Sequence, residues 1–178
     1  MRALGPGSVS SFLKIILDVV YVALSITAVV VALGLAGVLV FTVDPDIFGL
    51  RGALGVASDA VTKRPLLLGQ TLSAALYIAG VLVIVNRLRK IFATLTAGDP
   101  FEPENVRRLR VIGIMLGALE LSRYAAALIT TWIAPHDEKL TAGDGVSLTA
   151  WFAVLVVFVL AEVFREGARL RREAELTI

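Results

Sequence analysis

The stretch FLKIILDVVYVALSITAVVVALGLAGVLVFTV, residues 12–43, decides the class of this protein. It consists almost entirely of Val, Leu, Ile, Ala and Gly, and its only charges are Lys14 and Asp18 near its start. A helix rises about 1.5 Å per residue, so about 20 apolar residues cross the hydrocarbon core of a bilayer. A cleavable signal peptide has an apolar region of only about 7–15 residues. The stretch therefore predicts a membrane-spanning helix that is not a cleaved leader.

Three further segments have the length and composition of membrane-spanning helices, namely residues 65–85, 111–134 and 148–164. The 178-residue chain is 57% hydrophobic and only 18% charged, whereas charged residues make up about a quarter of a soluble domain. Its mean hydropathy is +0.85. We therefore predict an all-α fold, an integral membrane four-helix bundle that forms a single transmembrane domain over residues 1–178.

The basic residues predict which side of the membrane each loop occupies. The segment 86–110 has six basic side chains against three acidic ones, more basic residues than any other loop. Loops rich in Arg and Lys stay in the cytoplasm. Because four spans return the chain to the side where it began, the N-terminus and the tail 165–178 are expected on the cytoplasmic side as well.

The second span is predicted to outrun the bilayer on this side. A helix over residues 65–97 would be about 50 Å long, which exceeds the membrane thickness. The apolar face continues beyond the expected span through Leu88, Ile91, Phe92 and Leu95. Gly98 suits the position just after a helix end. Pro100 then blocks continuation of the helix.

The fourth span is also predicted to continue, into an amphipathic tail of balanced charge. We expect Leu170, Ala174 and Leu176 to face the projecting end of the second helix. The tail is either a solvated helix that ends the chain or part of a cytoplasmic helical pair that binds another protein through its apolar face. The arginines of the segment 86–110 are likewise open to two interpretations, anchors that touch anionic lipid or a docking surface for an acidic partner.

Two charged residues lie within the third span. Glu120 is about nine residues from its start, near the middle of the bilayer, where ionisable groups face a protein interior. Arg123 is close enough along the helix to pair with it. Gly113, Gly117, Glu120 and Tyr124 share one stripe, and the two glycines form a GxxxG pattern that permits close helix packing. The pair either fixes helix register or forms a polar site for a proton, ion or signal, and the stripe packs inside the bundle or against a second copy of the chain.

Two other charged residues invite simpler expectations. Asp18 follows Lys14 by four residues, and Glu162 precedes Arg165 by three. Residues at these spacings are neighbours on a helix surface. We expect a local ion pair in each case.

The residue inventory excludes several kinds of site. The chain has no Cys, which excludes disulfides, Fe–S clusters and thiol nucleophiles, and His136 is its one His. A multi-His metal site within one chain is therefore excluded as well. No phosphate-binding glycine loop, nucleophile elbow or zinc motif is present. We predict no catalytic residue, no metal, no cofactor and no direct contact with nucleic acid, so the protein is not expected to be an enzyme.

Two motifs on the expected cytoplasmic side resemble those of a known family. The first is AGDPF at 97–101, followed by Glu104-Asn105, Arg108-Leu109-Arg110 and Gly113; the second is AEVFR at 161–165, followed by Gly167 and the closing ELTI. These resemble the bacterial membrane proteins catalogued as domain of unknown function 2975, from about the first span to the last residue. The resemblance implies a four-span protein of the bacterial cytoplasmic (inner) membrane, often encoded beside a small helix-turn-helix regulator. The candidate partner-binding residues are Gly98, Pro100, Phe101, Asn105, Arg108, Arg110, Glu162 and Gly167.

We therefore expect a non-enzymatic membrane protein that signals or regulates through a cytoplasmic protein partner such as a helix-turn-helix transcription regulator. The alternative is a small transporter or channel subunit that uses Glu120 and Arg123. Four helices enclose a path only narrowly, so this alternative requires an oligomer. The expected partners are the lipid bilayer, the cytoplasmic regulator and a second copy of the chain.

Overall fold

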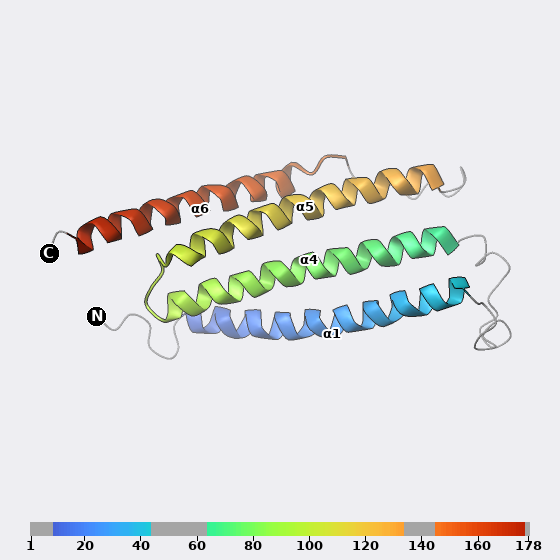
Figure 1. Cartoon of the computed structure of the whole chain (residues 1–178), viewed down its shortest axis with the longest axis horizontal. Helices are drawn as coiled ribbons and strands as arrows, with labels where there is room; N and C mark the ends of the chain where they lie inside the picture. The colour runs from blue at the N-terminus through green and yellow to red at the C-terminus, as the bar shows by residue number, and fades with distance from the viewer. Residues whose placement is uncertain (1–8, 44–63, 134–144, 177–178) are drawn as a thin grey trace. The chain divides into compact units, whose positions relative to one another are not determined.

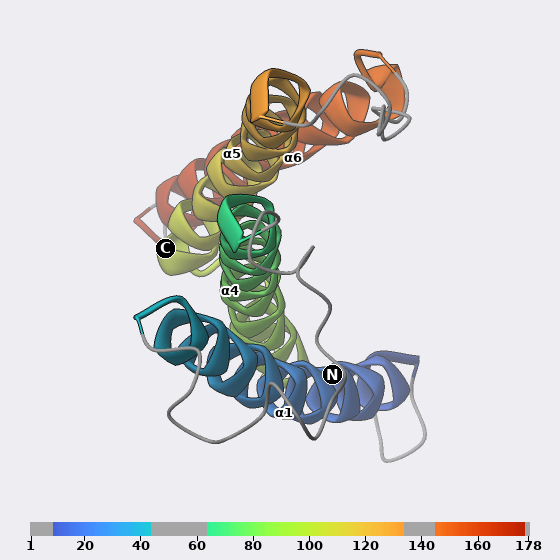
Figure 2. The same cartoon turned by 90° about the vertical axis from the view of Figure 1, so that its right-hand side faces the viewer.

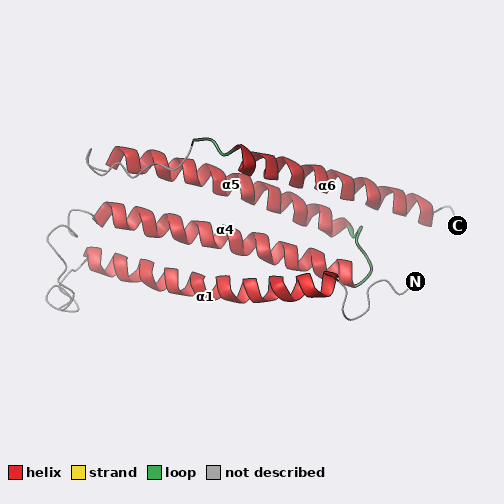
Figure 3. Cartoon of the chain, turned by 180° about the vertical axis from the view of Figure 1, so that it is seen from behind, coloured by secondary structure: helices red, strands yellow, loops and turns green. Residues whose placement is uncertain are grey.

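The computed structural model describes residues 9–43, 64–133 and 145–176 (Figure 1). Within these ranges the chain forms the helices α1 (Val9–Val43), α4 (Arg64–Thr96), α5 (Pro103–Ile133) and α6 (Leu148–Glu175), and the remaining residues are turns and loop (Figure 3). All four helices are long and apolar enough to cross a membrane. This confirms the predicted all-α fold with four helices of membrane-spanning type.

Each expected apolar segment falls in one of these helices, except that Ala134 lies outside the described residues. The two loops expected on the outer side, residues 44–64 and 135–147, also lie outside them, except for residues 64 and 145–147. The 33 residues of α4 agree with the length expected for the second helix. That α4 and α6 project into the cytoplasm stays a prediction.

The chain divides into two compact units. The first unit comprises residues 1–25, 80–120 and 146–178, and the second comprises residues 26–79 and 121–145. Thus α6 belongs to the first unit, whereas α1, α4 and α5 each contribute one part to each unit. The single transmembrane domain over residues 1–178 stays a prediction.

Parts of α4, α5 and α6 build the hydrophobic core of the first unit. Its buried centre is formed by Ile91, Leu109, Ile112 and Ala161. Because the contributing residues of each helix recur at intervals of three or four, each helix turns one face inward. Partly buried apolar side chains surround this centre, namely Ile84, Leu88, Leu95, Leu116, Val157 and Phe164. The apolar face expected for α4 is thereby confirmed at Leu88, Ile91 and Leu95. Phe92 is half-buried but is not among the residues that pack against this core.

The inward face of α6 differs from the predicted one. Ala161 and Ala168 are buried, whereas Leu170 and Leu176 are 54% and 84% exposed and Ala174 is exposed too. The expectation that these last three residues face α4 was wrong. Leu170 follows Ala168 by two residues, which places it about 200° further around the helix axis. In Figures 1 and 2, α6 runs beside α5 within the first unit.

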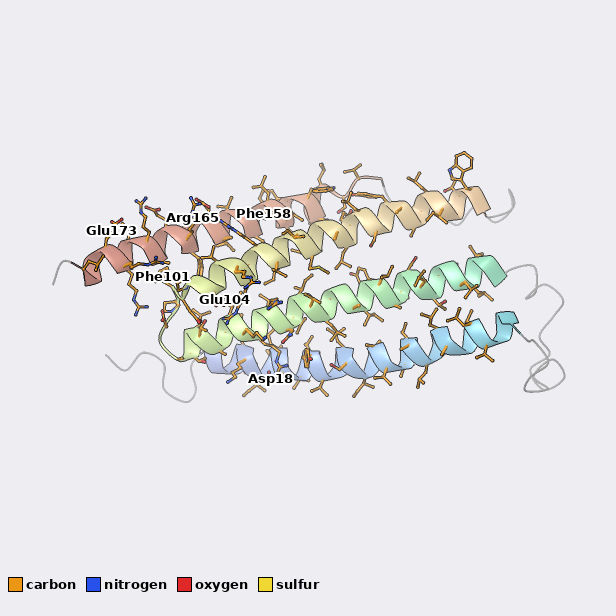
Figure 4. The ribbon with its side chains drawn as sticks, viewed as in Figure 1. Asp18, Phe101, Glu104, Phe158, Arg165 and Glu173 are labelled. Carbon is orange, nitrogen blue, oxygen red and sulfur yellow. The ribbon has the colours of Figure 1, made fainter. Side chains whose placement is uncertain are left out.

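The first unit also ties the start of α1 to α4. Nε of Arg89 donates to Oδ1 of Asp18 over 2.5 Å, and the guanidinium carbon of Arg89 lies 4.3 Å from the centroid of the Tyr21 ring. Asp18 on α1 is labelled in Figure 4. The expected local pair of Asp18 with Lys14 is corrected by this contact, because the carboxylate has its partner on another helix. The side chain of Arg89 is long enough to reach from α4 to the carboxylate of Asp18 on α1.

Candidate functional site

The helix α4 ends in a Schellman motif, in which a residue of positive φ follows the last helical turn. This motif begins the turn between α4 and α5. Gly98 has φ +88°, a value that only glycine adopts without strain. Its N–H donates to the carbonyl of Leu95 over 3.2 Å, and the N–H of Asp99 donates to the carbonyl of Thr94 over 3.0 Å. These bonds satisfy carbonyl groups that the helix end leaves unpaired. They confirm Gly98 at the position just after the helix end, and α5 then begins at Pro103.

The buried side chain of Asn105 forms hydrogen bonds that stabilise this turn. Its side chain is fully buried, with 0% exposure. Nδ2 donates to the hydroxyl of Thr94 over 2.7 Å and to the carbonyl of Pro100 over 3.2 Å, while Oδ1 accepts from Nη1 of Arg108 over 2.8 Å. One amide thus joins the end of α4, the turn and the start of α5. A buried polar group with its donors and acceptor engaged rigidifies the structure around it.

Arg108 belongs to the same network. Its side chain is only 14% exposed. Besides Asn105, Nη1 lies 3.4 Å from a carboxylate oxygen of Glu102 and 3.4 Å from the carbonyl of Lys90. This guanidinium is therefore directed into the turn. The neighbouring Arg107 and Arg110 are instead exposed on α5.

The turn packs against α6 through an aromatic contact. The ring centroids of Phe101 and Phe164 are 5.8 Å apart, with the planes inclined by 53°. Phe101 also covers Gly167, since a methyl group built on Gly167 would lie 2.5 Å from Cε1 of Phe101. Figure 4 labels Phe101 in this turn beside α6. Glycine at position 167 therefore permits the close approach of the ring to the helix.

An ion pair adds to this contact one turn further along α6. Nη1 of Arg171 donates to Oδ1 of Asp99. Each side chain is about half exposed, so the pair contributes less than a buried one would. We call this whole set the junction; it comprises Thr94, Gly98, Asp99, Pro100, Phe101, Asn105, Arg108, Phe164, Gly167 and Arg171.

The junction brings together most of the residues that the two sequence motifs predicted, but not all. Arg110 is exposed on α5, and Glu162 is exposed on α6, where it forms the expected local pair with Arg165. Sequence reasoning missed Thr94 and Arg171. Thr94 lies two residues before the end of α4, where a hydroxyl gives no distinctive signal. Arg171 lies 72 residues from Asp99, and no local pattern links them.

The polar residues that are expected within the membrane lie on α5. Glu120 is buried, with 9% exposure, in the first unit. Arg123 and Tyr124 are half-buried in the second unit, where the guanidinium carbon lies 5.0 Å from the centroid of the Tyr124 ring. An ion pair between Glu120 and Arg123 stays a prediction.

The two glycines of the GxxxG pattern have different surroundings. A methyl group on Gly113 would lie 3.0 Å from Cε2 of Phe158, a residue of α6 labelled in Figure 4. A methyl group on Gly117 would have no atom of the described residues within 4 Å. Gly80 of α4, which the sequence did not single out, would bring its methyl group within 2.6 Å of Cδ2 of Leu119. Close packing of α5 thus uses Gly113 and a glycine on another helix.

The second unit contains two grooves between α4 and α5. One has a volume of about 340 Å³ and is lined by Ser73, Tyr77, Ser122 and Arg123 among others. The other, of about 490 Å³, shares both serines and adds Gln70 together with small and apolar side chains. Within the described residues no group of three or more His, Cys, Asp or Glu could hold a metal ion.

Four helices of membrane-spanning length and composition suggest a multi-pass membrane protein. Residues 53–178 match the family described as protein of unknown function (DUF2975), and the chain belongs to this family. The resemblance drawn from the two motifs is thereby confirmed. The match covers α4, α5 and α6 and begins after α1, so it starts later than the resemblance was expected to start. No curated protein and no solved structure matches the chain.

Proposed function

We propose that this protein is a non-enzymatic membrane regulator of the bacterial inner membrane that binds a cytoplasmic protein partner, such as a helix-turn-helix regulator. One observation carries the proposal. The two sequence motifs, AGDPF at 97–101 and AEVFR at 161–165, meet in the junction through Phe101 and Phe164. The junction fixes the start of the α6 tail, residues 165–176, against the turn. A fixed helix is a better docking element than a free one, because less conformational entropy is lost on binding.

The chemistry of the junction favours binding over catalysis. Both N–H groups and the oxygen of the Asn105 amide are hydrogen-bonded, and Asp99 and Arg171 pair with each other. An active site needs a nucleophile or base aimed at an open position. Most polar groups of the junction are instead directed at one another, although Nε of Arg108 is buried without a hydrogen-bond partner among the described residues.

The exposed side of α6 has the features of a helix that docks into a groove. Ion pairs along it join Arg169 to Glu166 over 2.6 Å and to Glu173 over 3.5 Å. Leu170 and Ala174, which lie four residues apart on the helix, stay exposed beside these charges. A partner that recognises an amphipathic helix uses such apolar anchors and reads the charges around them. The basic segment 86–110 supports a cytoplasmic location for this side.

A photo-cross-linking amino acid at Leu170, introduced into the full chain in its native cells, tests the proposal. We expect one specific cytoplasmic protein to be captured, and we expect Asn105→Leu to reduce the yield while the protein still inserts into the membrane. Leu155, also exposed on α6, serves as the matched position within the apolar part of the helix. Equal capture from Leu170 and Leu155, or no change in any transcript when Phe101→Ala is introduced, would contradict a regulatory role.

A transporter or channel subunit is the second candidate, favoured by the buried Glu120 and by the groove that Arg123 lines. Polar side chains at membrane depth line substrate or ion pathways. Ion or proton flux in proteoliposomes measures this function directly. Flux should fall in Glu120→Gln and persist in Glu162→Gln, a matched change on the exposed part of α6. Flux that does not respond to Glu120→Gln would exclude Glu120 from a pathway.

A further inference from the structure

Five basic side chains of the first unit lie at one level of the helices. Two contacts define this level: Asp18 of α1 meets Arg89, and Arg108 of α5 meets the carbonyl of Lys90. The five side chains all lie within four residues of a contact residue on their own helix, which is about 6 Å along its axis. They are Lys14, Arg87, Lys90, Arg107 and Arg110.

These five differ from the basic residues that build the fold. Among the residues that the structure describes, Lys14, Arg87, Lys90 and Arg110 form no ion pair, and Arg107 reaches Glu104 only at 4.0 Å with its side chain 80% exposed. Arg89, Arg108 and Arg171 instead pair with Asp18, Glu102 and Asp99. The paired residues hold parts of the chain together, whereas Lys14, Lys90, Arg107 and Arg110 are exposed and Arg87 is half-buried. We call these five the basic girdle.

The girdle lies close to the level at which α4, α5 and α6 change from apolar to polar surface, whereas α1 also exposes the apolar Phe12 and Leu13 before Lys14. On one side of it α1 exposes Val19, Val22 and Ile26. On the other side lie the turn 97–102 and the charged α6 tail. Such a boundary coincides with the headgroup layer of a bilayer, where Arg and Lys attract anionic lipids by about 1 kcal/mol each.

We infer that the basic girdle binds the phosphate headgroups of anionic phospholipids. An acidic protein partner would also complement its charge. The lipid is favoured because the five side chains come from three helices at one level, which matches a planar layer of headgroups around the protein. The inference is independent of the proposed regulatory function, since it concerns the membrane boundary and not the exposed face of the tail.

Arg107 and Arg110 provide the test, with Arg169 and Arg172 as a matched control. In both pairs two exposed arginines stand three residues apart on one helix, and both pairs lose the same charge in the substitution Arg→Gln. The full chain is purified in a neutral detergent and titrated with phosphatidylglycerol or with phosphatidylcholine. Bound lipid is counted by native mass spectrometry, and thermal unfolding checks that each variant is folded.

We expect phosphatidylglycerol to bind more tightly than phosphatidylcholine. R107Q/R110Q should weaken phosphatidylglycerol binding on the order of tenfold, and R169Q/R172Q should leave it unchanged. Equal binding of both lipids, or equal losses in the two variants, would overturn the inference. Unchanged lipid binding in R107Q/R110Q together with loss of the protein cross-linked from Leu170 would overturn it in favour of an acidic protein at this face.

Discussion

The ring of Phe101 lies directly on Gly167, so close that a single methyl group at position 167 would meet Cε1 at 2.5 Å. This contact joins the turn between α4 and α5 to α6, and Phe164 completes it from the preceding turn of α6. The backbone of α6 therefore forms part of the surface that receives the ring. No residue other than glycine provides that surface without displacement of Phe101.

The first prediction concerns this contact. Gly167→Ala should lower the free energy of unfolding by about 1–3 kcal/mol, because the added methyl group overpacks the site. Alanine is otherwise the better helix former by about 1 kcal/mol. Helix propensity alone would therefore predict that Gly167→Ala raises the free energy of unfolding. Thermal unfolding of the detergent-solubilised protein measures the effect. In the background Phe101→Ala the same substitution should be neutral or stabilising, and a loss of equal size in both backgrounds would show that the ring is not the cause.

The second prediction separates the two glycines of the GxxxG pattern. Gly113→Ala should lower the melting temperature, because Phe158 stands 3.0 Å from the new methyl group. Gly117→Ala should leave the melting temperature unchanged or raise it, since the space around position 117 is open among the described residues. If both variants lose stability equally, Gly117 packs against a surface beyond the described residues of this chain, as a second copy would provide.

The third prediction concerns the buried amide of the turn. Asn105→Leu removes the partners of Thr94, Pro100 and Arg108 at once, and it should reduce the free energy of unfolding by about 2–3 kcal/mol. Asn105→Asp keeps the acceptor for Arg108 but loses both donors. Its effect should therefore be smaller than that of leucine, as measured by thermal unfolding at neutral pH. A leucine variant as stable as the wild type would mean that the amide is not what holds the turn.

The fourth prediction concerns the contact between α1 and α4. Asp18→Asn should destabilise by no more than about 1 kcal/mol, because the pair is partly exposed. Arg89→Gln removes both this ion pair and the stacking of Arg89 on Tyr21. The loss of the stacking should lower the free energy of unfolding by a further ~0.5–1 kcal/mol. The melting temperature of Arg89→Gln should therefore be lower than that of Asp18→Asn. The reverse order would indicate that Asp18 has a partner more important than Arg89.

Local signals in the sequence predicted the helices and the turn. Long apolar runs indicate membrane-type helices whatever their tertiary surroundings. Gly98 followed by Pro100 indicates the helix end, because the backbone conformation there depends on those residues themselves. The pairing of Glu162 with Arg165 was equally predictable, since both lie on one helix.

Tertiary relationships were beyond the same reasoning. Asp18 has a neighbour of opposite charge one turn away, but it pairs with a residue 71 positions distant. Leu170 is apolar like the core residues of α6, yet it lies on the exposed side, because the inward face is set by the small residues Ala161 and Ala168. A single sequence shows which residues are apolar or charged, but not which face of one helix meets which face of another.

The proposed function depends most on a shared cytoplasmic side for the turn 97–102 and the α6 tail. Because the chain contains no Cys, single cysteines can be placed at Ala97, Ala174 and Gly145 without other changes. Each variant is treated with a membrane-impermeant maleimide in intact cells and again after permeabilisation. We predict that Gly145→Cys reacts in intact cells and that Ala97→Cys and Ala174→Cys react only after permeabilisation. Labelling of Ala97→Cys in intact cells would place the turn outside and contradict the proposal.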